Sequence, residues 1–389
     1  MHIVGGFYRE LCHLPEWDAT MGSGARAALT AAALSPGTEF TTYAAASERM
    51  AVEALERHGI TATVATRPSP IVFAYFHPLS SPHVEPGREE LITQPSLQVT
   101  ANAVLRFGFL EGDAVVKARR AVYDPQTWRN PKPFSANGSS ADELALVMNE
   151  LEISSATGIE NIDQAAHHLI QTQKAEVVVV KQGPYGAKVY DASDSSTHVP
   201  AYRSARVFKI GTGDVFSAVF AHYWAQMRMS AHEAADLASR AVSLYCETRA
   251  FKFDHAALAA RQPVFATRGA TACIEAGIDA IGQRYALEEA RFALRELGVN
   301  AICPNLELAI PTGNYEAMLV IDDALPPESA GRLAEHAARG TSIIVLKERV
   351  EKDKPWPTDT LTTSDFTTAV YFTAWAAGEV FFTRHALNT

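Results

Sequence analysis

Small residues precede an acidic residue in the stretch Gly211-Thr212-Gly213-Asp214, and an apolar segment from Val215 to Trp224 follows it. Small residues let backbone N–H groups approach an anion closely, and the first turn of a helix adds the positive end of its dipole. A carboxylate beside a bound phosphate is a candidate base for an attacking hydroxyl group. The same pattern also fits a glycine turn in which the aspartate only caps a helix. The stretch alone leaves both interpretations open.

Two further motifs come earlier in the chain. Asn149 and Glu152 stand three residues apart, while Lys181 follows a run of valines and is itself followed by Gly183 and Gly186. The valines predict a buried strand, and the two glycines predict a tight turn directly after it.

An early Gly-x-Gly pattern, formed by Gly22 and Gly24, precedes Arg26 and an alanine-rich run. It predicts a turn that brings the start of a helix close to another group. That group is either packed backbone or a ligand, and the sequence does not decide between them.

Length and composition limit the class of protein. The 389 residues exceed the usual size of one domain, so two domains are expected. A formal charge of −10 argues against non-specific binding to nucleic acid or to anionic membranes, although it is compatible with a local phosphate site. The four cysteines are scattered without a CxxC pair, which favours a reduced, cytoplasmic protein without structural zinc. No signal-peptide core or membrane-spanning run is found, so we expect a soluble protein.

The elements that must position these residues alternate between strand and helix. This alternation predicts an α/β domain over residues 1–262, with a mostly parallel sheet covered on both faces. Within it, residues 40–105 contain short β-like runs separated by prolines, which predict a small projecting sheet. Ala141–Met148 is predicted as a helical turn and Gly269–Gly282 as a loop. Residues 263–389 are predicted to form a second, smaller α/β domain.

The three motifs, in their order along the chain, resemble those of the ribokinase-like sugar and nucleoside kinases, the PfkB family. Asn149–Glu152 is similar to the family's Asn-x-x-Glu motif, and Gly211–Asp214 is similar to its Gly-Ala-Gly-Asp signature. The valine strand with Gly183 and Gly186 is similar to the turn before its nucleotide site. The resemblance covers residues 1–262. It implies a ribokinase-like sandwich in which the small sheet, at about residues 40–105, is a lid over the sugar.

The resemblance also implies a reaction, the transfer of the γ-phosphate of ATP to a hydroxyl of a sugar or nucleoside. Asp214 would be the catalytic base. The amides of Gly211, Thr212 and Gly213 would stabilise the charge that develops on the transferred phosphoryl group.

Further residues receive ligand roles from the same resemblance. Lys181, Gly183 and Gly186 would bind the nucleotide. Asn149 and Glu152 would act on Mg²⁺ through water, since this hard cation prefers oxygen ligands and keeps its waters.

The substrate side departs from the family pattern. Gly22, Gly24 and Arg26 stand where the family binds its sugar, and Arg26 replaces the sugar-holding asparagine; an arginine there either binds an anionic substrate or is a surface residue at a helix start. Phe208 and Lys209 stand where the family has Asp-Thr. The family's N-terminal sugar-gripping aspartate has no clear counterpart, and the nearest acids are Glu10, Glu16 and Asp18.

The second domain resembles the nucleoside 2-deoxyribosyltransferases and related nucleotide N-hydrolases, over Gly282–Glu289, Gly298–Pro304 and Gly331–Glu335. The resemblance implies a flavodoxin-like domain that cleaves, transfers or binds nucleosides or nucleotides. Glu335 would be the catalytic carboxylate at the anomeric carbon. The alternative is a solvated glutamate in an alanine-rich helix, and Ser329 stands where the family has an acid.

These inferences predict a cytoplasmic, PfkB-type kinase that uses ATP and Mg²⁺ and acts on a small-molecule sugar or nucleoside. Neither nucleic acid nor a membrane is expected as a partner. Aromatic residues in Tyr371–Trp375 pack either into a core or into a homodimer contact. The competing hypothesis is a non-catalytic nucleotide- or sugar-binding regulatory protein built from degenerate enzyme domains.

Overall fold

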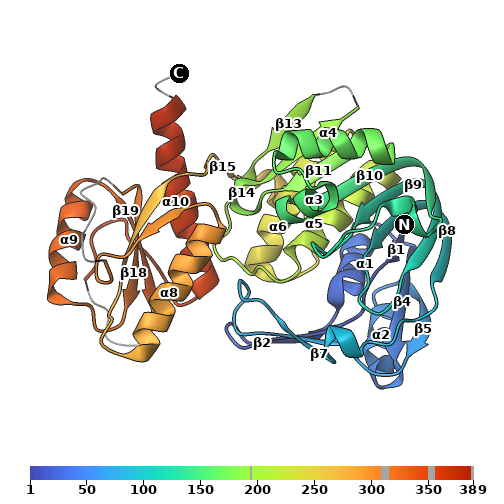
Figure 1. Ribbon diagram of the computed structural model, residues 1–389, viewed down its shortest axis with the longest axis horizontal. Coiled ribbons are helices and arrows are strands. Elements are labelled where there is room, and N and C mark those ends of the chain that lie inside the picture. The colour runs from blue at the N-terminus through green and yellow to red at the C-terminus, as the bar shows by residue number, and fades with distance from the viewer. Residues whose placement is uncertain (193–194, 308–314, 349–354, 387–389) are drawn as a thin grey trace. The chain divides into compact units, whose positions relative to one another are not determined.

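A computed structural model of the chain describes residues 1–192, 195–307, 315–348 and 355–386 (Figure 1). The chain divides into two compact units. The first consists of Met1–Gln182, Gly186–Ser204 and Lys209–Gln262, and the second of Pro263–Thr389 together with two short earlier segments, Gly183–Tyr185 and Ala205–Phe208. In these described ranges, no helix is both long enough and apolar enough to cross a membrane.

The first unit is built on a nine-stranded sheet with the order β13-β12-β11-β10-β9-β8-β1-β4-β5. Every neighbouring pair from β11 to β5 is parallel, and β12 and β13 are antiparallel additions at one edge. The mostly parallel sheet predicted from the sequence is therefore confirmed. The strands are β1 (His2–Val4), β4 (Thr38–Ala45), β5 (Ile60–Arg67), β8 (Leu97–Phe107), β9 (Ala114–Asp124), β10 (Ser140–Asn149), β11 (Val177–Lys181), β12 (Ala187–Asp191) and β13 (Ser196–Val199).

Helices cover this sheet. Val178 and Val180 of β11 share one core cluster with apolar residues of α3 and α4, because alternate residues of a strand point to the same face. Helix α5 packs against both α1 and α6, and α1 also contacts β4 while α6 contacts β12. The helices of this unit are α1 (Gly22–Leu34), α2 (Arg49–Glu56), α3 (Glu150–Thr157), α4 (Ile162–Gln173), α5 (Thr212–Ala221), α6 (Ala231–Thr248) and α7 (His255–Ala259).

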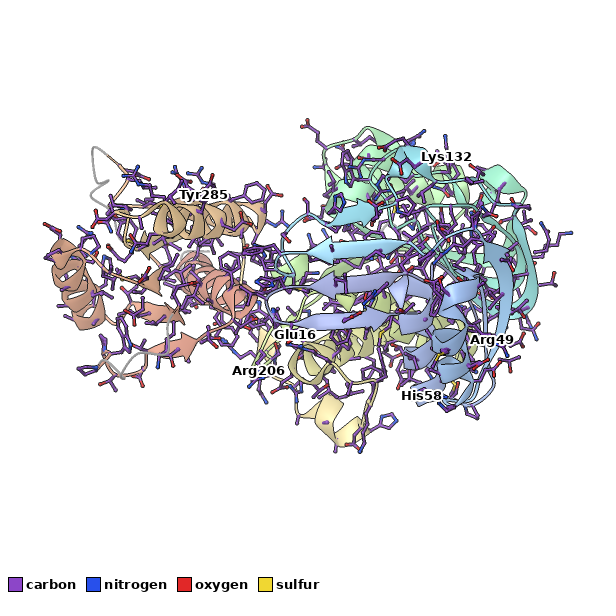
Figure 2. The ribbon with its side chains drawn as sticks, turned by 90° about the horizontal axis from the view of Figure 1, so that it is seen from below. Glu16, Arg49, His58, Lys132, Arg206 and Tyr285 are labelled. Carbon is purple, nitrogen blue, oxygen red and sulfur yellow. The ribbon has the colours of Figure 1, made fainter. Side chains whose placement is uncertain are left out.

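A small four-stranded sheet with the order β3-β2-β6-β7 belongs to the same unit. Its strands are β2 (Arg9–Cys12), β3 (Trp17–Thr20), β6 (Val72–Tyr75) and β7 (His83–Glu85). Glu16 lies in the turn between β2 and β3, at one end of this sheet (Figure 2). The boundaries predicted for the lid, residues 40–105, are thus wrong. β4, β5 and β8 join the large sheet, and β4 is buried on both faces as an interior parallel strand must be.

One predicted element of the first unit has the wrong type. Ala141–Met148 is not a helical turn but part of β10, which pairs with β9 and β11 in the middle of the sheet. The residues from Leu144 to Met148 are all buried. A strand buried on both faces shows a continuous apolar run rather than an alternating one, and a short run of this kind has no periodicity that separates it from a helix.

The second unit contains a five-stranded parallel sheet with the order β17-β16-β18-β19-β20. Its strands are β16 (Thr271–Glu275), β17 (Asn300–Ile302), β18 (Ala317–Asp322), β19 (Ser342–Lys347) and β20 (Leu361–Thr363), and its helices are α8 (Ile281–Glu296), α9 (Pro327–Ala338) and α10 (Phe366–Ala386). The predicted loop Gly269–Gly282 therefore contains an interior strand of this sheet, β16, whose threonine, alanine and cysteine residues give a weak apolar signal.

Candidate functional site

The stretch around Asp214 forms the predicted glycine turn at the start of a helix. Gly211 has a φ of +78°, in the left-handed region that favours glycine, and Thr212 begins α5. Asp214 lies in the first turn of α5 and is 6% exposed. The N-terminus of α5 therefore places backbone N–H groups beside a buried carboxylate, an arrangement that suits an anionic ligand.

Both carboxylate oxygens of Asp214 are held by side chains from other elements. Arg26 Nη1 donates to Oδ2 at 2.7 Å, and Gln126 Nε2 donates to Oδ1 at 3.2 Å. Burial raises the pKa of Asp214 to about 6; Arg26 opposes this rise, and Glu10 and Asp124 add to it. The pKa of Asp214 is thus moved towards neutral pH, as suits a group that exchanges a proton.

Arg26 of α1 has no exposed surface. Its guanidinium group donates to both carboxylate oxygens of Glu10, to Asp214, to the carbonyl oxygen of Gly22 and to the hydroxyl of Tyr245. It is therefore not the surface arginine that one of the two sequence interpretations allowed. Its donors are directed at groups of the protein itself rather than at an open site.

Gly22 and Gly24 let α1 pack closely on the backbone that follows β1. A Cβ atom on Gly22 would lie 2.6 Å from the carbonyl oxygen of Gly6, and one on Gly24 would lie 2.6 Å from that of Gly5. Of the two roles that the sequence left open for these glycines, the structure shows the packed backbone.

Three adjacent parallel strands end in polar residues at the same edge of the large sheet. These are Asp124 at the end of β9, Asn149 at the end of β10 and Lys181 at the end of β11. Lys181 Nζ donates to Asp124 Oδ2 at 2.7 Å, and Ser217 Oγ of α5 donates to the same oxygen at 2.7 Å. The carboxyl edge of the sheet and α5 therefore meet, and the carboxyl edge is the side on which open α/β sheets bind ligands.

Asp124 and Gln126 were missed by the sequence interpretation. Asp124 is completely buried, and Gln126 reaches Asp214. The signal was present, because an acidic residue directly after a buried strand and before a proline lies at the carboxyl edge of the sheet. Without the strand order, nothing in the sequence placed this edge beside α5.

Asn149 and Glu152 form a reciprocal cap on α3. Asn149 Oδ1 accepts from the Glu152 amide and Glu152 Oε2 accepts from the Asn149 amide, both at 2.8 Å. Burial, and then Asp124, raise the pKa of Glu152 to about 7, while Lys181 opposes the rise. The cap engages Glu152 through one carboxylate oxygen, so the residue fits a magnesium ion held through water. Within the described part of the chain, no three acidic, histidine or cysteine side chains converge as direct metal ligands would.

A second lysine lies at the start of α5. Lys209 Nζ donates to Thr212 Oγ1 at 2.9 Å. Burial lowers the pKa of Lys209, and neighbouring Lys181 lowers it further. A lysine thus stands beside the glycine turn, at the position where the PfkB-type kinases that the sequence resembles have a threonine.

The two glycines after β11 are separated by the division into units. Gly186 belongs to the first unit and has a φ of +88°. Gly183 begins a short segment of the second unit, in which Trp375 Nε1 donates to the carbonyl oxygen of Pro184 at 3.0 Å. Lys181 lies in the polar cluster described above, whereas the structure does not bring Gly183 to it.

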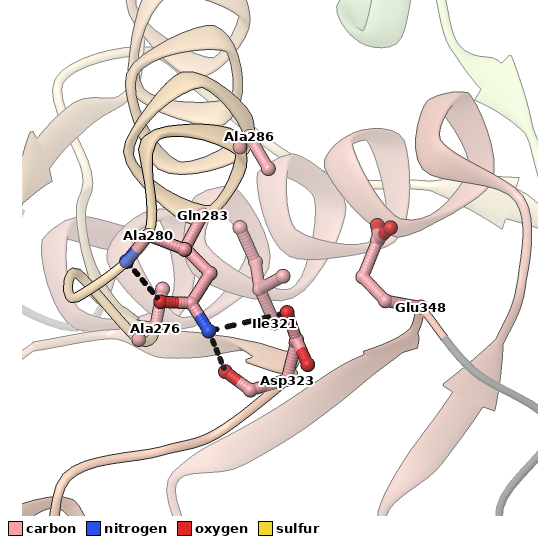
Figure 3. A pocket seen from close by; sticks show the side chains of 9 residues that line it. Ala276, Ala280, Gln283, Ala286, Ile321, Asp323 and Glu348 are labelled. Carbon is pink, nitrogen blue, oxygen red and sulfur yellow. Dashed lines mark hydrogen bonds between the residues drawn. The ribbon is translucent and has the colours of Figure 1, made fainter.

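The second unit has a pocket of about 330 Å³ at the carboxyl ends of β16, β18 and β19 (Figure 3). Gln283 of α8 crosses it, accepting from the Ala280 amide at 2.9 Å and donating to Asp323 at 3.2 Å. Glu348 lies across from Asp323, and burial followed by the charge of Asp323 raises the pKa of Glu348. The lining residues are Ala276, Gly277, Ala280, Gly282, Gln283, Ala286, Ile321, Asp323 and Glu348.

Glu335 does not line this pocket. Its side chain is 57% exposed and forms an ion pair with Arg339 one turn later on α9. The residue of the Gly331–Glu335 motif that points inward is Arg332, whose guanidinium group pairs with the buried Glu275. The exposed position favours the solvated-glutamate alternative for Glu335.

Comparison with known proteins concerns the kinase-like part of the chain. Residues 135–253 match the family described as pfkB family carbohydrate kinase. Ribokinase from Arabidopsis thaliana, in complex with ribose and ATP, matches with a TM-score of 0.51 and 18% identity, over 66% of this chain and 96% of that one. Fructokinase from Vibrio cholerae O395, bound to fructose, ADP and calcium ion, matches with a TM-score of 0.49 and 16% identity, over 67% and 98%. No match is found among curated protein sequences.

These matches support a pfkB-type carbohydrate kinase domain at residues 135–253, and the Arabidopsis enzyme shows that the fold is ribokinase-like. Neither the family match nor these two structures is a nucleoside deoxyribosyltransferase.

Proposed function

We propose that residues 1–262 form a kinase that transfers the γ-phosphate of ATP to a hydroxyl group of a sugar or nucleoside. The observation that carries the proposal is the buried Asp214 in the first turn of α5, directly after the Gly211–Gly213 turn. The pfkB match at residues 135–253 includes this turn, and the plant ribokinase of the same fold is complexed with ribose and ATP.

In the proposed reaction, Asp214 accepts the proton of the acceptor hydroxyl while that oxygen forms the new bond to the γ-phosphorus. The bond from the γ-phosphorus to the bridging oxygen breaks, and ADP leaves with its electron pair. The N–H groups of Gly211 and Gly213 stabilise the charge on the transferred group, and Lys181 and Lys209 add positive charge. The Thr212 N–H, the third amide expected in this role, donates instead to the Lys209 carbonyl oxygen at 3.3 Å. Magnesium, held through water by Asn149 and Glu152, would neutralise the phosphate charge.

The test is ADP release from ATP–Mg²⁺ in the presence of a panel of free sugars and nucleosides. Asp214→Asn is expected to lower turnover about 10²- to 10⁴-fold, because the acceptor proton loses its base. Asp142→Asn is the matched control, since Asp142 is exposed on β10. An Asp214→Asn variant with the turnover of the wild type excludes Asp214 as the base. A wild type that no sugar or nucleoside stimulates favours the competing non-catalytic binding protein.

A specific observation favours a second function, the binding of a nucleoside or nucleotide by the second unit. The pocket lies where β16 has β17 on one side and β18 on the other, and such a reversal of strand order is where open α/β sheets bind ligands. Asp323 and Glu348 supply acceptors for ribose hydroxyls, and alanine and isoleucine side chains supply an apolar wall for a base. The exposed position of Glu335 leads us to propose binding rather than cleavage of the glycosidic bond.

Isothermal titration calorimetry with nucleosides and nucleotides tests this second function. Asp323→Asn is expected to weaken binding by about tenfold, the effect of one lost charge-assisted hydrogen bond. Glu296→Gln, at an exposed glutamate of α8, is the control and should bind as the wild type does. If Asp323→Asn binds unchanged, or if no nucleoside or nucleotide gives heat, the pocket does not have this function.

A further inference from the structure

The guanidinium group of Arg26 is committed to the protein's own carboxylates. It bonds both oxygens of Glu10, and one of its nitrogens also donates to Asp214 at 2.7 Å. Removing a cation from water is unfavourable unless the cation is paired, and here two carboxylates compensate the charge of Arg26. Arg26 also packs on the anion-binding turn, because a Cβ atom on Gly211 would lie 2.1 Å from its Nε atom.

These three charged residues come from three different elements. Glu10 belongs to β2 of the small sheet, Arg26 to α1, and Asp214 to α5. Tyr245 of α6 fixes the remaining side of the guanidinium group and donates in turn to the carbonyl oxygen of Ile210, next to the turn. A planar guanidinium group bonded on several sides has one orientation, so it transmits the position of Glu10 to the carboxylate of Asp214.

We propose that Glu10, Arg26 and Asp214 form a clasp through which the small sheet orients the carboxylate of Asp214 and sets its charge. The proposal rests on the proposed function, in which Asp214 is the base. Arg26 is then a positioning residue rather than a contact of the acceptor. Arg26 Nη1 holds Oδ2 at 2.7 Å and Gln126 Nε2 holds Oδ1 at the longer distance of 3.2 Å, so the arginine is the closer of the two partners that orient this carboxylate.

The clasp predicts opposite shifts in the pKa of Asp214 when Arg26 loses its charge and when Glu10 loses its charge. The groups that face Asp214 are Arg26 of α1, Glu10 of β2, Tyr75 of β6, Asp124 of β9, Glu152 of α3, Lys181 of β11, Lys209 before α5 and Tyr245 of α6. Loss of the positive charge of Arg26 raises the pKa of Asp214, and loss of the negative charge of Glu10 lowers it. A base must be ionised, so turnover rises with pH through its pKa.

The test is the pH dependence of kcat/KM for ATP-dependent phosphorylation in the wild type and three variants of the full chain. Arg26→Met is expected to move the acidic limb to higher pH, and on that limb the rate falls about tenfold for each pH unit that the limb moves. Glu10→Gln is expected to move the limb to lower pH. Arg26→Lys keeps the charge but not the planar fork, so the limb stays near that of the wild type while kcat falls. The proposal is overturned if the acidic limb does not move in these variants, or if it moves in the same direction in Arg26→Met and Glu10→Gln.

A second readout separates the clasp from the proposed kinase. The carboxyl carbon of Asp214 is followed by NMR in protein labelled with [¹³C-carboxyl]-aspartate, and its signal is assigned by its loss in Asp214→Asn. The same opposite shifts in titration midpoint are expected for Arg26→Met and Glu10→Gln. If these shifts occur in a protein that phosphorylates no acceptor, the clasp stands and the kinase proposal fails. If Arg26→Met does not fold, Glu10→Gln alone decides, because an unchanged midpoint in that variant overturns the clasp.

Discussion

Ionised side chains of both signs are buried together beside the α5 turn. The cluster contains the carboxylates Glu10, Asp124, Glu152 and Asp214 and the cations Arg26, Lys181 and Lys209. Each buried charge has a neighbour of opposite sign or a hydrogen bond, which makes burial tolerable. Glu152 shows the cost of burial most clearly in this cluster. Burial opposes the ionisation of its carboxyl group and raises its pKa to about 7.

This raised pKa predicts how stability depends on pH. Between the ordinary pKa of 4.5 and the folded value of about 7, the folded state binds a proton that the unfolded state releases. Glu152 therefore destabilises the fold increasingly as the pH rises through this window, by about 1–3 kcal/mol in total. Glu152→Gln removes the ionisation and keeps an oxygen for the Asn149 amide. The variant should gain stability relative to the wild type on going from pH 5 to pH 8.

Urea unfolding at the two pH values measures this gain. Glu160→Gln, at an exposed glutamate that follows α3, is the control and should show no such pH dependence. A stability difference between Glu152→Gln and the wild type that is the same at pH 5 and pH 8 contradicts the assignment.

Tight turns, as well as strands, position the residues of this cluster. Gly186 follows β11 with a φ of +88°, and a Cβ atom there would lie 2.0 Å from the carbonyl oxygen of Val199. Gly158 ends α3 with a φ of +70°, and no atom of the described residues would lie within 4 Å of a Cβ atom added there. The two glycines have the same backbone requirement but a different amount of space.

This pair predicts two different costs of an added methyl group. Gly158→Ala should lower the free energy of unfolding by about 1–2 kcal/mol, the cost of the left-handed backbone for an L-residue. Gly186→Ala should lower it by about 1–3 kcal/mol more, because the backbone of Val199 must move. Urea unfolding with a common slope measures both, and equal costs would show that β13, which ends at Val199, shifts without strain.

Some elements could be predicted from the sequence and others could not, for a common reason. The helix at Ile162–Gln173 has polar residues around an apolar stripe and an asparagine cap, so its pattern defines it. β10 and β16 lie inside parallel sheets, where both faces are buried and the alternation that identifies a strand is absent.

The candidate site divides in the same way. The Gly211–Asp214 turn was predicted because a glycine turn and its helix are local in the sequence. Gln126 and Glu10 were not assigned to it, because their contacts with Asp214 and Arg26 span 88 and 16 residues and depend on the strand order. Local patterns thus predicted the glycine turn and its helix, and only the fold could show which side chains surround the carboxylate of Asp214.

At the scale of the whole molecule, the two units share a parallel α/β plan but differ in what their sheet edges hold. The carboxyl edge of the nine-stranded sheet holds ion pairs such as Lys181–Asp124, whereas that of the five-stranded sheet opens into a pocket with two acidic side chains. The first arrangement suits a charged, transferring group, and the second suits a ligand that offers hydroxyl groups. The proposed functions follow this difference.

The division into units also has a consequence for how the protein is made. Gly183–Tyr185 and Ala205–Phe208 belong to the second unit, where the Val207 amide donates to Thr368 at 2.9 Å and the Pro184 carbonyl oxygen accepts from Trp375. On the ribosome these two segments emerge long before residues 368 and 375. A nascent or truncated chain that stops at Gln262 holds two backbone groups whose partners have not yet been synthesised. Folding of the second unit, to which both segments belong, should therefore finish only after α10 has left the ribosome.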